Sequence, residues 1–106
     1  IIECLNSIDE NIKVIVIENS NDQNLKKKIV SDYKNVEVIL SESNLGYGCA
    51  NNLGLLKVKT NYALIINPDV ILKKNAITNF FVTVKKIPNF GIIAQYQKTK
   101  NTRILI

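Results

Sequence analysis

The sequence contains no histidine, methionine or tryptophan, and it has only two cysteines. Without histidine, zinc sites built on imidazole and His-based catalytic triads are not expected. The two cysteines, Cys4 and Cys49, are too few for a disulfide framework and lack metal-ligand spacing. This cysteine usage fits a reducing, cytoplasmic setting.

Long apolar runs are also missing, since none approaches the roughly 18 residues that a membrane-spanning helix needs. We expect no transmembrane segment, and a place at the inner membrane face only through the rest of a larger parent protein. The chain begins with Ile1 rather than methionine and ends on the apolar run 104–106. Because natural termini are usually polar, we expect residues 1–106 to be a single partial domain of a longer protein.

Arginine is scarce too, although the chain is basic. Fourteen Lys and Arg residues oppose nine acids, which gives a net charge of +5, and Arg103 is the only arginine. The lysines are spread along the sequence, mostly on the polar sides of predicted helices. Nucleic-acid binding favours arginines and exposed aromatics along one stripe. A solvated surface is therefore the simpler interpretation, and we expect no nucleic-acid partner.

Short β-branched runs alternate with helical patterns along the chain. The order β-α-β-α-β-α-β follows the last turns of a helix at residues 1–8. It predicts an α/β fold with a Rossmann-like, open, mostly parallel sheet and helices on both faces. The predicted strands are 12–17, 36–41, 62–66 and 91–96. The helices between them carry Leu25, Ile29 and Tyr33, then Ala50, Leu53 and Leu56, then Ile77, Phe81 and Val84.

Three polar clusters follow the first three predicted strands, at 18–22, 44–52 and 67–69. In an open α/β sheet, ligands bind beyond the carboxyl ends of the strands, so we expect all three clusters on one edge. Loops rich in asparagine and glycine at this edge suit a polar ligand with many hydroxyl and carbonyl groups.

In the first cluster, Ser20 or Asn21 could cap the next helix, and Asp22 is balanced between capping and a ligand role. Glu18 ends a buried strand, where its carboxylate could accept a hydrogen bond from a base or a ribose hydroxyl.

In the second cluster, Gly46 and Gly48 supply unusual backbone angles or close approach. Asn51 and Asn52 could cap a helix or touch a ligand. Gly54 lies inside a predicted helix, where close packing against the sheet is the simplest reason for a glycine.

In the third cluster, Asp69 follows Asn67 and Pro68 at a strand end. One carboxylate together with ligand phosphates is a common way to hold Mg²⁺ or Mn²⁺. Taken alone, Asp69 is better interpreted as a turn or cap residue.

Together the clusters resemble the nucleotide-sugar domain of the family-2 glycosyltransferases, which have the GT-A fold, and most of all their rhamnosyltransferase-like branch. The likeness covers residues 1 to about 97. Each motif alone is moderately specific, but three in register are a strong signal. The residues that carry it are VIENSND at 16–22, NLGYGCANNLG at 44–54 and LIINPDV at 64–70.

The resemblance implies a role for each matching residue. Glu18, with Asn19 beside it, matches the acidic position that meets the nucleobase or ribose. Asn44 and Gly46 match the loop near the nucleotide, and Asn52 matches the asparagine of the family's Asn-x-Gly helix start. The nucleotide-sugar-binding set implied in this way is Glu18, Asn19, Asn44, Gly46, Asn51, Asn52 and Asn67.

The sequence also departs from the family pattern. Asp69 matches the last acid of the metal-binding Asp-x-Asp motif, whereas Asn67 replaces its first acid and Asn51 replaces a frequent arginine. The family's opening strand, which ends in Pro-x-Tyr/Phe-Asn, would precede residue 1. The catalytic general base would follow residue 106, so no residue here is assigned that role.

The resemblance thus implies a metal-dependent, inverting glycosyltransferase fragment, inactive by itself. Its partners would be a nucleotide-diphosphate sugar donor and a glycan or lipid-linked acceptor, in polysaccharide or cell-surface glycan synthesis. Without its opening strand, the sheet could self-associate. The alternative is a non-catalytic module that binds a nucleotide sugar or a protein.

Overall fold

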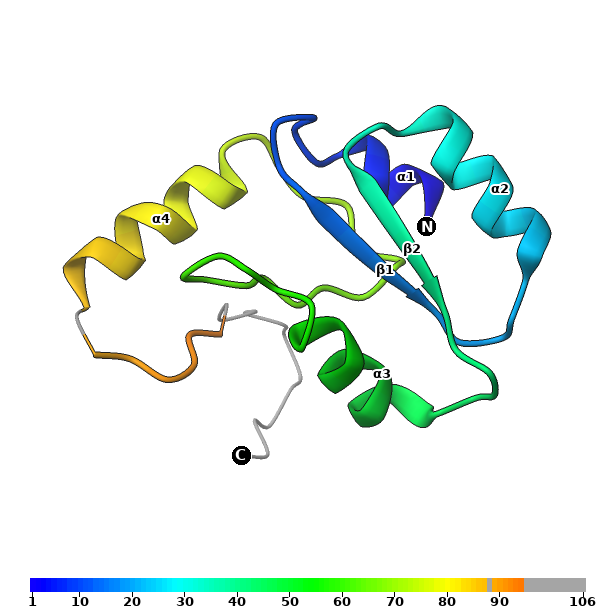
Figure 1. Cartoon of the computed structure of the whole chain (residues 1–106). Helices are drawn as coiled ribbons and strands as arrows, with labels where there is room; N and C mark the ends of the chain where they lie inside the picture. Colours follow the sequence, from blue (N-terminus) through cyan, green and yellow to red (C-terminus); the bar gives the residue numbers. More distant parts are fainter. Residues whose placement is uncertain (88, 95–106) are drawn as a thin grey trace, which may run out of the picture. The chain divides into compact units, whose positions relative to one another are not determined.

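The computed structural model describes residues 1–87 and 89–94 and contains six regular elements within them (Figure 1). Helices and strands alternate through the first part of the chain, and one more helix follows a long loop. The elements are α1 (Ile2–Asn6), β1 (Val14–Glu18), α2 (Gln23–Asp32), β2 (Val36–Leu40), α3 (Gly46–Leu55) and α4 (Ala76–Lys86).

The two strands form a parallel pair, in which Val14 lies opposite Val36 and Glu18 lies opposite Leu40. Parallel pairing requires a crossover, and α2 supplies it by carrying the chain back to the start of the sheet. The carboxyl ends of β1 and β2 consequently lie side by side. The polar residues that follow each strand begin at this common edge.

One face of the sheet carries the hydrophobic core. Val36 and Val38 of β2 are buried with Leu5 of α1 and Ile29 of α2, and Ile29 has no exposed surface. The predicted apolar face of α2 is confirmed, because Leu25 and Tyr33 pack against the same cluster. Val14 and Val16 of β1 pack there too, as the alternation of side chains along a strand requires.

The opposite face of β1 is covered by α3. Ile17, out of phase with Val14 and Val16, points to this side, and a Cβ on Gly54 would lie 3.4 Å from its Cγ1 atom. The expected packing reason for a glycine inside this helix is therefore confirmed. Helices cover both faces of a parallel sheet, as predicted.

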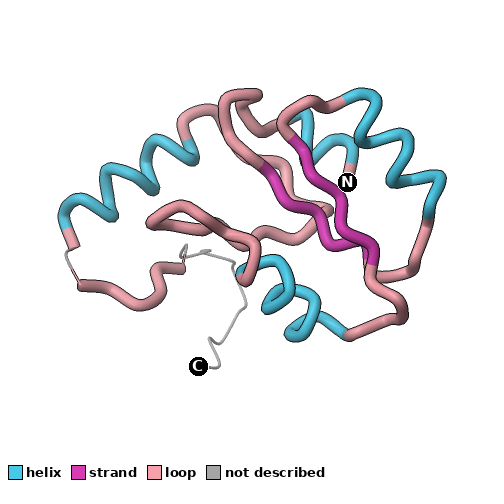
Figure 2. Tube along the Cα trace, in the orientation of Figure 1, coloured by secondary structure: helices cyan, strands magenta, loops and turns pink. Residues whose placement is uncertain are grey.

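The sheet is smaller than predicted within the described residues. Residues 62–66, expected to be the third strand, form no ladder and run as an extended loop between α3 and α4 (Figure 2). Residues 91–94 of the expected fourth strand are likewise not a strand, and 95–96 lie outside the described part, as does the tail 98–106. Backbone donors and acceptors become a strand only where a neighbouring edge pairs with them.

The chain divides into two compact units, residues 1–74 and 75–106. In the second unit, α4 begins after Asn75, whose φ of 68° is left-handed, and ends with Lys85 and Lys86 in its last turn. Phe81, expected to face inward, is 47% exposed. In the described part of the chain, no helix is both long and apolar enough to cross a membrane.

Candidate functional site

Glu18 ends β1 and is only 7% exposed. Its Oε1 accepts hydrogen bonds from the Ser20 backbone N–H at 3.0 Å and from the Ser20 hydroxyl at 2.5 Å. Its Oε2 accepts from the Asp22 backbone N–H at 2.5 Å. The carboxylate thus organises the turn between β1 and α2.

These bonds also fix the ionisation of Glu18. The Ser20 hydroxyl bond is the main cause that lowers the pKa of the Glu18 carboxyl, and the backbone N–H groups of Asp22 and Ser20 add to it. Burial and the nearby Asp22 carboxylate act in the opposite direction but do not prevail. Glu18 is therefore an anion at neutral pH.

Asp22 caps α2. Its Oδ1 accepts from the backbone N–H groups of Asn24 at 2.9 Å and Leu25 at 3.0 Å. The capping interpretation of Asp22 is confirmed, whereas Ser20 and Asn21 do not cap this helix. Asn21 instead takes a left-handed φ of 62° in the turn, and the Ser20 hydroxyl is committed to Glu18.

Asn19 joins the end of β1 to the loop that follows β2. Its side-chain Nδ2 donates to Asn44 Oδ1 at 2.9 Å. Its Oδ1 accepts from the Leu45 backbone N–H at 2.8 Å and from the Ser41 hydroxyl at 3.0 Å. The first two predicted clusters are therefore brought together at one edge of the sheet.

Ser41 is a residue of this edge that was not predicted. It is 3% exposed, and its backbone N–H donates to the Glu18 carbonyl at 3.0 Å. The single hydroxyl hydrogen of Ser41 is shared between Asn19 Oδ1 at 3.0 Å and the Glu18 carbonyl at 3.2 Å. A small hydroxyl residue at the end of an apolar strand was the available signal. Ser41 was expected as the last residue of the predicted strand 36–41, with no role of its own at the edge.

Asn44 and Gly46 shape the start of α3. Asn44 Oδ1 accepts from the Gly46 backbone N–H at 2.9 Å, and Gly46 has a φ of +74°, which a residue with a Cβ rarely adopts. A Cβ on Gly46 would meet nothing within 4 Å, so the backbone angle is the constraint on this residue. The same expectation for Gly48 is wrong, because Gly48 lies inside α3 without a positive φ and a Cβ on it would meet nothing within 4 Å.

Asn51 and Asn52 lie in the second turn of α3, which begins at Gly46. The capping interpretation of this pair is therefore wrong. Asn51 is half-buried and Asn52 is exposed, and the Asn52 carbonyl accepts the Leu56 N–H in the helix ladder. In the described part of the chain, the side-chain amides of Asn51 and Asn52 make no hydrogen bond to another residue.

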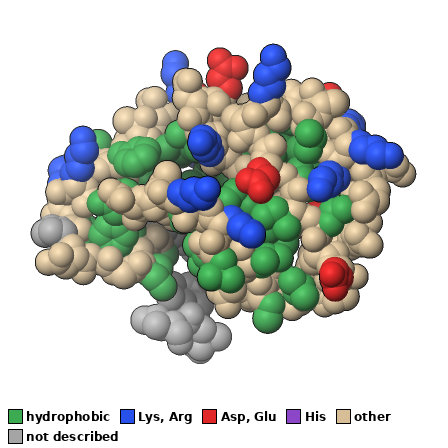
Figure 3. All heavy atoms as spheres, viewed as in Figure 1, with side chains coloured by type: hydrophobic (Ala, Val, Ile, Leu, Met, Phe, Trp, Pro, Cys, Tyr) green, Lys and Arg blue, Asp and Glu red, His purple; other side chains and the backbone are tan. Residues whose placement is uncertain are grey.

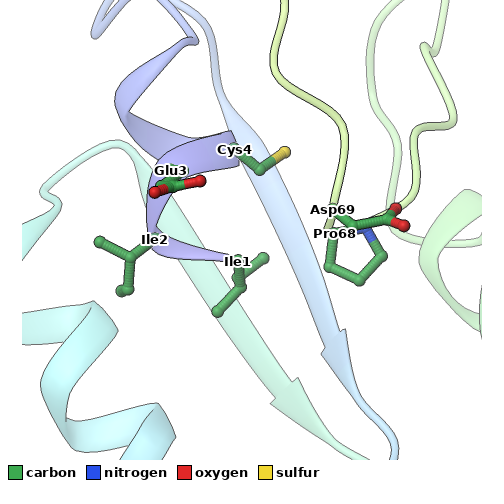
Figure 4. A pocket seen from close by; sticks show the side chains of 6 residues that line it. All are labelled: Ile1, Ile2, Glu3, Cys4, Pro68 and Asp69. Atoms are coloured by element: carbon green, nitrogen blue, oxygen red, sulfur yellow. The ribbon is translucent and has the colours of Figure 1, made fainter.

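The third cluster contacts α1. The Asn67 carbonyl accepts a hydrogen bond from the Cys4 thiol, with an Sγ–O distance of 3.8 Å. The Ser7 hydroxyl oxygen accepts a hydrogen bond from the Leu72 backbone N–H at 3.0 Å. Pro68 and Asp69 line a hollow with residues 1–4, and the Asp69 carboxylate points away from α1 (Figure 4). Burial raises the pKa of the Cys4 thiol and keeps it protonated.

This placement differs from the expectation of one edge for all three clusters. The hydrogen bonds of residues 67–72 run to one another and to α1 rather than to Asn19 or Asn44. Because residues 62–66 do not pair in the sheet, no ladder fixes Asp69 at its carboxyl edge. The structure brings together two of the three clusters.

Asp69 is the carboxylate that the third cluster offers to a divalent cation, and Glu3 lines the same hollow from α1. Asp69 is exposed, and among the described residues no group of three His, Cys, Asp or Glu side chains could hold a metal. Mg²⁺ accepts this arrangement when ligand phosphates and water complete its oxygen shell. The residues therefore fit a metal that arrives with a diphosphate, and they form no preassembled cage.

On the face shown in Figure 3, positive charge is not concentrated in one patch. Lysines are scattered over the face shown in Figure 3, with hydrophobic and neutral side chains between them. Such a distribution is typical of a solvated surface rather than of a binding stripe.

Comparisons with known proteins find relatives of this chain. The model of the family described as glycosyl transferase family 2 matches residues 1–104. Rhamnosyltransferase WbbL from Escherichia coli (strain K12) is 33% identical over 92 residues, which cover 80% of this chain and 34% of that protein. The chain thus spans about a third of its relative, and no solved structure matches it.

The family match extends over the sheet, both its helical layers and all three clusters. The GT-A type of α/β fold expected from the three motifs follows from it. This chain belongs to glycosyl transferase family 2.

Proposed function

We propose that this chain supplies the donor-binding part of an inverting glycosyltransferase that moves a sugar from a nucleotide diphosphate to an acceptor hydroxyl. The observation that carries the proposal is the edge made by Glu18, Asn19, Asn44 and Gly46, where two loops meet beyond parallel strands. This is the position at which open α/β sheets bind nucleotides.

The chemistry of this edge suits a nucleotide. Glu18 is held ionised, and its two oxygens accept three hydrogen bonds of the about four that a carboxylate can take. It retains capacity to accept a base N–H or a ribose hydroxyl. Asn51 and Asn52, in the second turn of α3, are proposed to add amide groups for the sugar or the diphosphate. Asn67, which lies apart from this edge in the third cluster, is proposed to contribute its amide on the side of Asp69.

Asp69 is the candidate ligand of Mg²⁺ or Mn²⁺. When bound, such a cation neutralises charge on the departing diphosphate. Because Asn67 stands where the family has a second acid, Asp69 contributes one carboxylate and depends on the nucleotide for the remaining oxygens. Cation affinity without nucleotide should then be weak.

The match covers 34% of the relative's length, and we propose that the general base and the acceptor-binding residues belong to the remainder of such a protein. The printed name of the relative suggests rhamnose as the transferred sugar. We propose a glycan or lipid-linked acceptor, in polysaccharide or cell-surface glycan synthesis, and a place in the cytoplasm or, through the rest of a larger protein, at the inner membrane face.

A second candidate is a module that binds a nucleotide sugar, or a protein, without turnover. The single acid at Asp69 and the missing second acid at Asn67 favour it. The two candidates share the donor site and differ in transfer, so a transfer assay on the longer protein separates them.

Calorimetric titration with UDP, dTDP and GDP, with and without Mn²⁺, tests donor binding directly. We expect one nucleotide to bind in the presence of Mn²⁺ and its affinity to fall about tenfold or more in Asp69→Ala, as expected for loss of a charged ligand. Asp32→Ala is the matched control, because Asp32 ends α2 at the opposite end of the sheet. Equal binding by both variants would contradict the role of Asp69.

A further inference from the structure

We propose that Asn19 and Asn44 are positioning residues that lock the loop 41–46 onto the end of β1, and that they act through each other rather than by touching the donor. The proposal depends on the proposed function for its purpose, though not for its geometry. The latch consists of the Asn19–Asn44 hydrogen bond and the bonds that each side-chain oxygen accepts.

The Asn19 amide is almost fully used inside the protein. Its Oδ1 accepts two hydrogen bonds, from the Leu45 backbone N–H and the Ser41 hydroxyl, which fill both lone pairs. Its Nδ2 donates to Asn44. Only one N–H of this side chain remains for any ligand.

The Asn44 oxygen is used in the same way. It accepts from Asn19 Nδ2 and from the Gly46 backbone N–H, both at 2.9 Å. The orientation of each amide follows from these partners, because a flip would set an NH₂ group against a backbone N–H, of Leu45 for Asn19 and of Gly46 for Asn44.

The latch has a rigid base. Ser41 is buried, and its backbone N–H donates to the Glu18 carbonyl, while its single hydroxyl hydrogen is shared between Asn19 Oδ1 and that carbonyl. The loop is thus attached at residues 41, 44 and 45 to Glu18, the last residue of β1, and to Asn19, which follows it. In this way the left-handed Gly46 and the start of α3 are located relative to the Glu18 carboxylate.

Substitutions distinguish a latch from a pair of ligand contacts. Asn44→Ala removes the acceptor for both Asn19 and Gly46, whereas Asn44→Asp keeps an acceptor and strengthens it by charge. Asn19→Asp keeps the acceptor for Leu45 and Ser41 but loses the donor to Asn44. The control is Asn11→Ala, since Asn11 pairs with Asp9 at the amino-terminal side of β1.

Amide exchange and side-chain resonances measured by NMR test the latch without any ligand. We expect Leu45 N–H exchange to rise about tenfold or more in Asn19→Ala, with the α2 amides unchanged. The Asn19 side-chain N–H resonance should move upfield in Asn44→Ala and downfield in Asn44→Asp. If Leu45 exchange stays as in the wild type, or if the Asn19 resonance ignores both Asn44 variants, the latch is overturned.

A double-mutant cycle on nucleotide affinity tests positioning. With the nucleotide that binds best among UDP, dTDP and GDP, we expect Asn19→Ala and Asn44→Ala each to weaken binding about tenfold, and the double variant to bind about as weakly as either. Losses that multiply would show two independent ligand contacts and overturn the proposal.

Failure of the proposed function has a different signature. In that case no nucleotide binds even to the wild type, while the exchange and resonance results still decide whether the latch exists.

Discussion

The charge on Glu18 connects the turn after β1 to the pH dependence of folding. Because the pKa of Glu18 is lowered in the folded state, its stabilising contribution is complete above the ordinary value of 4.5 and is lost as pH falls through the lowered pKa. Glu18→Gln should cost about 1–3 kcal/mol at neutral pH, as hydrogen bonds to a charged group do.

Urea unfolding measured at neutral pH and in steps below pH 4.5 checks this. The difference between the wild type and Glu18→Gln should shrink as the solution becomes more acidic. A difference that stays constant with pH would show that the Glu18 charge does not stabilise the turn.

Gly54 tests how closely α3 approaches β1. A methyl group there would lie 3.4 Å from Ile17 Cγ1, and alanine favours a helix over glycine by about 1 kcal/mol, so Gly54→Ala should be neutral or stabilising. Leucine is also a good helix former but is too large, so Gly54→Leu should cost about 1–3 kcal/mol.

Gly48→Leu is the matched control, since a Cβ on Gly48 meets nothing within 4 Å. Thermal unfolding of the variants measures the effect. If Gly54→Leu and Gly48→Leu have the same melting temperature, the close contact between α3 and Ile17 is contradicted.

The sequence predicted the roles of some residues and not of others. The role of Gly54 could be predicted from the sequence. A glycine inside a helix is less favourable than alanine, so its presence indicates that a neighbouring segment packs closely there. The partners of Asn19 could not be predicted, since they come from residues 41–45, and only the parallel pairing of β1 with β2 brings these close.

At the scale of the element, the start of α2 depends on one side chain. Asp22→Ala removes the acceptor for two backbone N–H groups and should destabilise the protein by about 0.5–2 kcal/mol. Asp22→Asn keeps an oxygen in the same place and serves as the control. Chemical denaturation of the wild type, Asp22→Ala and Asp22→Asn measures the effect. Equal midpoints for Asp22→Ala and the wild type would rule out the cap.

The helices were predicted well and the strands only in part. The apolar face of α2 depends on spacing within one segment, which the sequence displays directly. A strand also needs a partner edge, and the apolar run at 62–66 carries no information about whether an edge is available. For this reason the pattern that identified β1 and β2 also indicated a strand that the structure does not form.

For the whole molecule, apolar side chains on the segment after α3 predict association at high concentration. Leu64 is 45% exposed and Ile65 is 48% exposed on backbone that forms no ladder. Exposed apolar strand-like segments are sites of association. We expect the sedimentation coefficient of the wild type to increase with protein concentration. Leu64→Lys should reduce this increase, and Ala63→Lys, on the same exposed segment, should reduce it less. A monomer at all concentrations would contradict this.

The central claim is that a nucleotide binds where the loops after β1 and β2 meet. Mapping amide chemical shifts by NMR, during titration with UDP, dTDP or GDP in the presence of Mg²⁺, tests it most directly. The account predicts that the largest changes fall on residues 18–22 and 44–47, with small changes at the opposite end of the sheet around residues 9–13 and 32–35. Changes centred on that opposite end, or no change with any of the three nucleotides, would contradict it.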